Sequence, residues 1–168
     1  GTTSVFTIEK KGNLLEIEIQ DRIKRNFSLS LIDIESSDVD FNSKVSNMNF
    51  TTKVDIKSVD LIDAIEDCIV VSDACSFVIK NSEFIIEARG SNTLNSSRIN
   101  FSSDDLKISG EECKARYSLE YLQKFMKGAK LCEVTEIKFS HEHPLRMDFR
   151  ISPMELSFIL APRIETDD

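Results

Sequence analysis

Residues 118–129, SLEYLQKFMKGA, decide the fold of this chain. Their apolar members recur at intervals of one, three and four, at Leu119, Leu122, Phe125, Met126 and Ala129. This spacing predicts an amphipathic helix with a single apolar stripe. Ser118 occupies the N-cap position, where its hydroxyl is expected to accept a hydrogen bond from a free backbone N–H group. Because the stripe has to be buried, we expect the helix to lie on a β-sheet.

A second helix is predicted at about residues 59–71, from an equivalent stripe formed by Leu61, Ala64, Ile65, Cys68 and Ile69. Each helix follows one strand-like segment and precedes three more. Strands are expected at 48–56, 76–80, 83–88 and 97–101 around the first helix, at 113–117, 136–140, 145–151 and 156–160 around the second, and at 106–109 between the two sets. We therefore predict an α+β domain over residues 48–168, built from two copies of a β-α-β-β-β unit with both helices on an antiparallel sheet.

The strand expected at residues 145–151 indicates which side of the sheet faces the core. Its residues alternate between apolar and charged. We expect the apolar side to face the helices, and Arg146, Asp148 and Arg150 to face water.

The N-terminal part of the chain has predicted strands but no predicted helix. The strands are expected at 4–9, 14–19 and 27–31, with a turn at Lys11-Gly12-Asn13 between the first two. Three strands have a face to bury and no layer of their own to bury it against. Residues 1–32 are therefore interpreted as a piece of a domain.

Residues 33–47 are rich in Ser, Asp and Asn, which is typical of a linker. Its isolated apolar residues are Ile34, Val39, Phe41 and Val45. They either anchor the linker on an adjacent sheet or help to line a groove for a partner.

The charge balance argues against one class of function. The chain has 168 residues, with 21 Lys+Arg, 29 Asp+Glu, a net charge of −8 and a pI of about 4.9. Proteins that bind nucleic acid by coating its phosphates carry a basic surface instead. No run is apolar and long enough to cross a membrane, and the N-terminus lacks the pattern of a signal peptide. We expect an intracellular protein without a membrane partner.

The sequence contains no convincing motif for catalysis or cofactor binding. Its five glycines are far apart, which argues against a phosphate-binding loop. His141 and His143, directly before Pro144, are two candidate metal ligands without a third nearby, and a turn is the alternative interpretation. We therefore predict no enzymatic activity, no cofactor and no metal site.

The cysteines lack the C-x-x-C spacing of zinc and redox sites. We expect them to be small buried residues, with a disulfide or a reactive thiol as the alternatives. They are Cys68, Cys75, Cys113 and Cys132.

Two stretches are more specific than the periodicity. Residues 115–127, ARYSLEYLQKFMK, and residues 160–165, LAPRIE, resemble the last helix and the C-terminal signature of the proliferating cell nuclear antigen family, the sliding clamps of archaea and eukaryotes. Shorter matches lie at 27–34, 71–73, 134–139 and 143–147. The resemblance extends over nearly the whole chain.

The resemblance implies an architecture. In this family a protomer has two similar α+β domains joined by a connector, and three protomers close head to tail into a ring around duplex DNA. Residues 48–168 then form the C-terminal domain, 33–47 the connector, and 1–32 the closing strands of an incomplete first domain. The chain would correspond to the C-terminal two thirds of a protomer from a homotrimer or heterotrimer. Gly1 would mark a truncation for expression, a processed chain or a split chain.

The resemblance also implies a function, that of a non-enzymatic processivity factor in DNA replication and repair. Such a clamp tethers DNA polymerase, flap endonuclease, DNA ligase and the clamp loader. Each partner inserts a short peptide with a glutamine, an apolar residue and two aromatic residues. The location would be the cytoplasm in an archaeon or the nucleus in a eukaryote.

Single residues receive roles from the resemblance. The apolar part of the peptide pocket is assigned to Ile34, Phe41, Met48 or Phe50, Pro144, Ile159 and Leu160, and the backbone and polar contacts to Ala161, Pro162 and Arg163. The DNA-facing cations would be Lys24, Arg25, Lys124 and Lys127. The subunit contact would use Phe27, Leu29, Leu31, Ser97, Ile99 and Phe101. For Met48, Phe50, Ile159 and Leu160 the alternative interpretation is that they are core or half-buried strand residues that need no ligand.

Two departures from the family pattern keep alternatives open. The connector is longer, with Ser and Asp in place of Pro and apolar residues, so the residue that covers the pocket is open among Val39, Phe41 and Val45. Asp63 and Glu66 stand where relatives place Lys or Arg. A stand-alone peptide-docking module that never encircles DNA is therefore the second hypothesis. An enzyme that uses His141 and His143 is the third.

Overall fold

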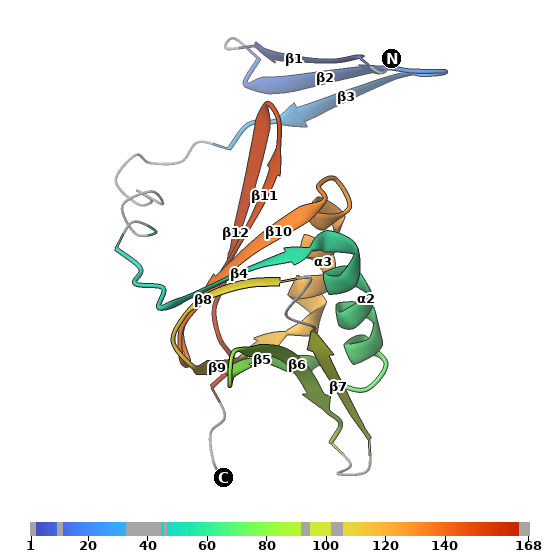
Figure 1. The fold of residues 1–168 in the computed structure, drawn as a ribbon. Coiled ribbons are helices and arrows are strands. Elements are labelled where there is room, and N and C mark those ends of the chain that lie inside the picture. Colours follow the sequence, from blue (N-terminus) through green and yellow to red (C-terminus); the bar gives the residue numbers. More distant parts are fainter. Residues whose placement is uncertain are drawn as a thin grey trace. The chain divides into compact units, whose positions relative to one another are not determined.

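The computed structural model describes residues 3–9, 12–32, 45, 47–91, 95–101 and 106–164 (Figure 1). These residues belong to two compact units, residues 1–47 and residues 48–168. None of the helices formed by the described residues has the length and apolar character needed to span a membrane.

The first unit contains an antiparallel sheet in the order β1-β2-β3. Its strands are β1 (Thr3–Glu9), β2 (Leu14–Gln20) and β3 (Lys24–Ser30). The three predicted strands are confirmed, although β3 begins earlier than predicted. Phe6, Ile17 and Phe27 lie opposite one another across the sheet, and Phe6 and Phe27 are 65% and 47% exposed. The apolar row on this face is therefore largely open to solvent. The interpretation of residues 1–32 and 33–47 as closing strands and connector stays a prediction.

The second unit contains two repeats of the same order of elements. The first is β4 (Thr52–Lys57), α2 (Ser58–Ile69), β5 (Ala74–Lys80), β6 (Glu83–Arg89) and β7 (Ser96–Phe101). The second is β9 (Cys113–Ser118), α3 (Leu119–Ala129), β10 (Val134–Phe139), β11 (Leu145–Ile151) and β12 (Met154–Leu160), with β8 (Leu106–Gly110) between the repeats. The predicted α+β class and the duplicated β-α-β-β-β unit are confirmed.

The two repeats exchange their first strands. The sheets have the orders β12-β11-β10-β4-β8 and β7-β6-β5-β9. Strand β4 of the first repeat thus pairs with β10 of the second, with Lys57 opposite Val134. Strand β9 of the second repeat pairs with β5 of the first, with Ser118 opposite Ala74. Each sheet therefore requires strands from both repeats.

The first N–H group of each helix also bonds to the opposite repeat. The N–H of Ser58 donates to the carbonyl of Glu133 at 2.8 Å, and the N–H of Leu119 donates to the carbonyl of Asp73 at 2.9 Å. Glu133 and Asp73 occupy equivalent turns, each after the helix of the other repeat. The predicted capping bond from the Ser118 hydroxyl is wrong, because this side chain makes no hydrogen bond to the helix. A carbonyl from the opposite repeat satisfies the first N–H of α3 instead.

Two predicted boundaries are also corrected. Helix α2 ends at Ile69 rather than Val71, because the N–H groups of Val71 and Ser72 both donate to the carbonyl of Cys68 and close the helix. Strand β4 begins at Thr52 rather than Met48. The segment before it is bound to a side chain instead of a strand, as described below.

The apolar stripes of both helices and the inner faces of both sheets form one core. Helices α2 and α3 lie side by side over it (Figure 1). Its largest fully buried side chains include Tyr117, Phe77, Phe84, Phe139 and Phe149. All four cysteines are free thiols, so the disulfide alternative is wrong. Burial is confirmed for three of them, whereas Cys132 is half-buried.

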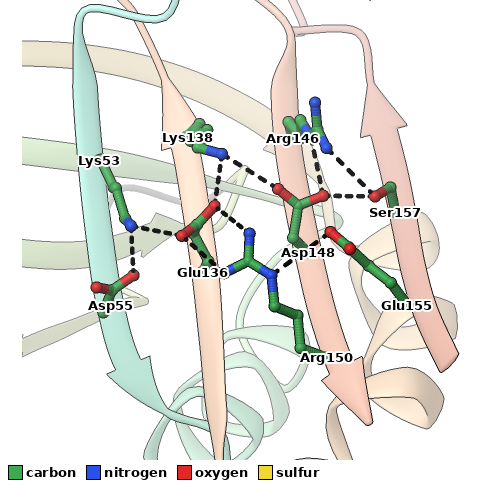
Figure 2. A network of polar contacts seen from close by, with 9 residues as sticks. All are labelled: Lys53, Asp55, Glu136, Lys138, Arg146, Asp148, Arg150, Glu155 and Ser157. Carbon is green, nitrogen blue, oxygen red and sulfur yellow. Dashed lines mark hydrogen bonds and ion pairs between the residues drawn. The ribbon is translucent and has the colours of Figure 1, made fainter. Parts of the chain in front are cut away.

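The outer face of the five-stranded sheet carries an acidic row. The strand register places Asp55, Glu136 and Asp148 directly beside one another on β4, β10 and β11. Carboxylates that face each other on adjacent strands repel, so this row needs cations between its members. Figure 2 shows that basic side chains from the neighbouring rows reach into it.

The prediction that Asp148 faces water is wrong, because this residue is only 1% exposed. Its carboxylate accepts hydrogen bonds from Arg146 at 2.8 Å, from Lys138 at 3.3 Å and from Ser157 (Figure 2). The long side chains of Arg146 and Lys138 help to cover it. Arg150 is exposed as predicted, and Arg146 is partly exposed.

Glu136 is the most strongly shared acceptor of the row. It is 6% exposed and contacts Lys53, Lys138 and Arg150. Burial alone would raise the pKa of Glu136, but hydrogen bonds from Lys138, Lys53 and Arg150 outweigh it and lower the pKa to about 2. The carboxylate is therefore ionised in the folded chain down to strongly acidic pH.

We predict that Glu136→Gln lowers the free energy of unfolding near pH 7 by roughly 1–3 kcal/mol, because three cations lose their common charged acceptor. The folded-state pKa of Glu136 lies below its unfolded value, so its stabilising contribution is present above about pH 4.5 and is lost as the pH falls toward 2. Urea unfolding near pH 7, 4.5 and 3 measures both effects.

The control for this prediction is Glu155→Gln on β12, which is separated from the strand of Glu136 by β11. Glu155 is half-exposed and contacts Arg150 at 3.5 Å. An exposed pair of this kind contributes about 0–1 kcal/mol. Equal loss of stability from pH 4.5 to 3 in wild type and in Glu136→Gln would contradict the assignment.

Candidate partner-binding site

The last part of β12 presents its two predicted pocket residues on opposite faces. Ile159 lies opposite Arg146, on the outer face, and is partly exposed. Leu160 lies opposite Leu145 and packs against the core. Of these two residues, only Ile159 is therefore placed to contact a partner on the outer face, and Leu160 has the core role that was the alternative interpretation.

The turn between β10 and β11 lies beside the end of β12. Glu142 has a φ of 52° and its N–H donates to the carbonyl of Lys114 at 3.0 Å. The Tyr117 hydroxyl donates to the carbonyl of His143 at 2.8 Å. Burial raises the pKa of Tyr117 far above its usual range, so the hydroxyl keeps its proton. These bonds fix the turn that ends in Pro144, which is partly buried.

The segment that contains Met48 and Phe50 is held against the same turn. The Ser140 hydroxyl donates to the carbonyl of Asn49 at 3.0 Å and accepts the N–H of Thr51 at 2.8 Å. Because one side chain takes both backbone groups, this segment does not begin a strand. Met48 and Phe50 are both partly buried. Their predicted strand position is wrong, and their assignment to the pocket stays a prediction.

Residues 161–163 continue from β12 along β9. Ala161 is exposed, Pro162 is partly buried and Arg163 is exposed. The N–H of Arg163 donates to the carbonyl of Arg116 at 2.7 Å. The structure thus gathers Ile159, the Pro144 turn and residues 161–163 in one unit.

Sequence reasoning missed several residues that shape this site. Tyr117 and Ser140 orient the turn through their hydroxyl groups, and the carbonyl of Arg116 holds the C-terminal segment. Only Tyr117 had a signal, because a buried tyrosine needs a partner for its hydroxyl. The others act through contacts between residues far apart in the sequence.

Two predicted pocket residues, Ile34 and Phe41, lie outside the described residues, as does Val39. Val45 belongs to the first unit and is partly buried. Their role in covering the pocket stays a prediction.

The predicted DNA-facing cations have different partners. Lys24 contacts Glu18 at 2.9 Å, Arg25 contacts Asp21, and Lys124 contacts Glu120 at 2.9 Å. Lys127 forms no ion pair within the described part of the chain. It lines a groove of about 370 Å³ with Lys124 and Lys130, between α2 and α3. Sequence reasoning missed Lys130, although it extends the three-residue spacing of Lys124 and Lys127.

The predicted contact between subunits falls on two edge strands. Strand β3 is exposed along its length, with Phe27 and Leu29 about half exposed, and Leu31 follows it. Strand β7 is the edge of its sheet, but Ile99 and Phe101 pack against their own core. The subunit contact through β3 and β7 stays a prediction. Ser97 is partly buried on the same face.

Both histidines make contacts within the turn between β10 and β11. His143 Nδ1 lies 3.2 Å from the carbonyl of His141, and His141 lies 4.0 Å from Glu142. The described residues contain no group of three or more His, Cys, Asp or Glu side chains arranged to hold a metal ion.

Comparison with known proteins places this geometry in a family. The model of the proliferating cell nuclear antigen C-terminal domain matches residues 44–164. The DNA polymerase sliding clamp of Pyrococcus furiosus is 35% identical over 164 residues, which cover 94% of this chain and 64% of that protein. The clamp of Pyrococcus abyssi is 34% identical over 171 residues, covering 98% of this chain and 67% of that protein. The chain thus spans about two thirds of the length of these relatives.

A solved structure supports the fold. Proliferating cellular nuclear antigen from Entamoeba histolytica superposes with a TM-score of 0.76 at 20% identity, over 96% of this chain and 64% of that chain. The predicted clamp fold is confirmed. With a family match over most of its residues, this chain belongs to the proliferating cell nuclear antigen family.

Proposed function

We propose that this chain is the larger part of a DNA sliding clamp protomer, which binds partner proteins through the outer surface around Ile159, Pro144 and residues 161–163. The observation that carries the proposal is that hydrogen bonds hold the backbone of this surface in one conformation. Three hydrogen bonds that involve the hydroxyl groups of Ser140 and Tyr117 fix the turn and the segment before β4. A preordered surface binds a short peptide at a smaller entropic cost than a flexible one.

The proposed action requires no bond-making chemistry. The whole protein would form a trimeric ring around duplex DNA inside the cell. It would tether DNA polymerase, flap endonuclease, DNA ligase and the clamp loader. A closed ring stays on DNA by topology, so it needs only local positive charge in its pore. The groove lined by Lys124, Lys127 and Lys130 is the candidate for that charge.

A second candidate function, a peptide-docking module that does not encircle DNA, is favoured by one observation. Three of the four predicted DNA-facing cations already contact acidic neighbours. The exposed Asp63 and Glu66 on α2 add negative charge near the groove. The oligomeric state distinguishes this function from the first.

We predict that the chain binds a peptide with the glutamine–apolar–aromatic–aromatic pattern weakly. Changing both aromatic residues to Ala should weaken binding at least about tenfold, because aromatic anchors dominate such interfaces. Titration calorimetry measures both affinities. Equal heats for the two peptides would refute the peptide site.

A variant of the chain tests the location of this binding. Ile159→Asp should weaken binding about tenfold, since it places a charge on the outer-face contact. Val70→Asp is the control, because Val70 is an apolar residue that is 87% exposed and does not line the proposed site. Equal affinity of Ile159→Asp and Val70→Asp for the peptide would place the site elsewhere.

We also predict that the 168-residue chain does not by itself form a stable closed ring. An edge strand recruits a neighbour only while its own sheet holds it in register. In the sheet of β3, Phe6 and Ile8 are largely exposed and Phe27 is about half exposed, which favours nonspecific association over one register. Light scattering at several concentrations should show a monomer or a mixed population. A homogeneous trimer at micromolar concentration would contradict this prediction.

A further inference from the structure

One residue, Arg163, attaches the C-terminal segment after β12 to the rest of the second unit at two points. The backbone N–H of Arg163 donates to the carbonyl of Arg116 on β9 at 2.7 Å. The guanidinium Nη1 of the same residue donates to Asp73 Oδ2 at 2.6 Å. Asp73 is 90 residues away in the sequence, in the turn between α2 and β5. Arg163 therefore joins the end of the second repeat to the first.

The backbone of Asp73 is held in place by α3 and β9. Its backbone carbonyl accepts the N–H of Leu119, the first residue of α3, at 2.9 Å. The next residue, Ala74, is 1% exposed and pairs with Ser118. The hydrogen bond from Arg163 lowers the pKa of Asp73, so the carboxylate is charged at neutral pH.

The equivalent turn of the other repeat shows that the fold does not require this ion pair. Glu133 stands there, and its carbonyl accepts the N–H of Ser58 at 2.8 Å in the same way. Within the described residues its carboxylate has no ion pair. The backbone contact is thus shared by both repeats, whereas the side-chain contact exists only next to the C-terminal segment.

The consequence concerns Ala161 and Pro162. Leu160 is fixed on one side of them by its pairing with Leu145, and Arg163 is fixed on the other side. Their backbone groups are therefore held between two anchors. Holding such a segment in advance reduces the conformational entropy that a partner must remove on binding.

We propose that Asp73 is a positioning residue for the partner-binding surface, which holds Arg163 so that residues 161–163 lie ready along β9. This inference rests on the proposed peptide-binding function. Asp73 acts through Arg163 and does not itself contact the peptide. Both side chains are exposed, by 74% for Asp73 and by 44% for Arg163, so the contribution is expected to be modest and sensitive to salt.

The test uses Asp73→Asn in the full 168-residue chain, with Glu133→Gln as the matched control. Asn keeps the backbone carbonyl that Leu119 requires and removes only the charge. In low salt, Asp73→Asn should bind the glutamine–apolar–aromatic–aromatic peptide about two- to fivefold more weakly than wild type. Near 0.5 M salt the difference should shrink, because ions screen the pair. Glu133→Gln should bind like wild type at both salt concentrations.

A second readout requires no peptide. Hydrogen exchange of the Arg163 amide should be faster in Asp73→Asn than in wild type or Glu133→Gln, because its bond to Arg116 loses support. If wild type binds the peptide, and Asp73→Asn has the same affinity and the same exchange rate of the Arg163 amide, the positioning role is overturned and the peptide site stands. Absence of wild-type binding overturns the peptide site, and with it the positioning role, whatever the exchange rates.

Discussion

The crosswise pairing of the two repeats is the constraint on which the rest of the second unit depends. Strand β4 completes the sheet of the second repeat, and β9 completes the sheet of the first. The first N–H of each helix is satisfied by a carbonyl from the opposite repeat, at Glu133 for α2 and at Asp73 for α3. Neither repeat has a complete sheet or a complete helix start without the other, so the two are expected to fold together.

The same pairing generates the electrostatic arrangement of the outer face. Joining β4 to β10 brings Asp55 next to Glu136, and Asp148 stands on the other side. Lys138 bridges Glu136 and Asp148, while Lys53 and Arg150 share Glu136 (Figure 2). Every buried side-chain nitrogen and oxygen of the described residues has a hydrogen-bond partner, which makes this polar face compatible with a stable sheet.

The candidate site is built where the repeats meet. The turn before β11 is held by Tyr117 of β9, and the segment before β4 is held by Ser140. The C-terminal segment in turn covers part of the open edge of β9 through Arg163. A surface assembled from both repeats is rigid only when both are folded, which connects the duplication of the fold to the proposed binding of partners.

The sequence by itself determined the helices, most strands, the duplicated unit and the stretch from Leu160 to Arg163, because apolar periodicity and short motifs are local signals. The tertiary structure decided the burial of Asp148, the lack of a capping bond from Ser118 to α3, and that Leu160 rather than Ile159 faces the core. It also decided the pairing of Asp73 with Arg163. The physical reason is that burial and pairing depend on which strands become neighbours, and strand exchange between repeats leaves no local mark in the chain.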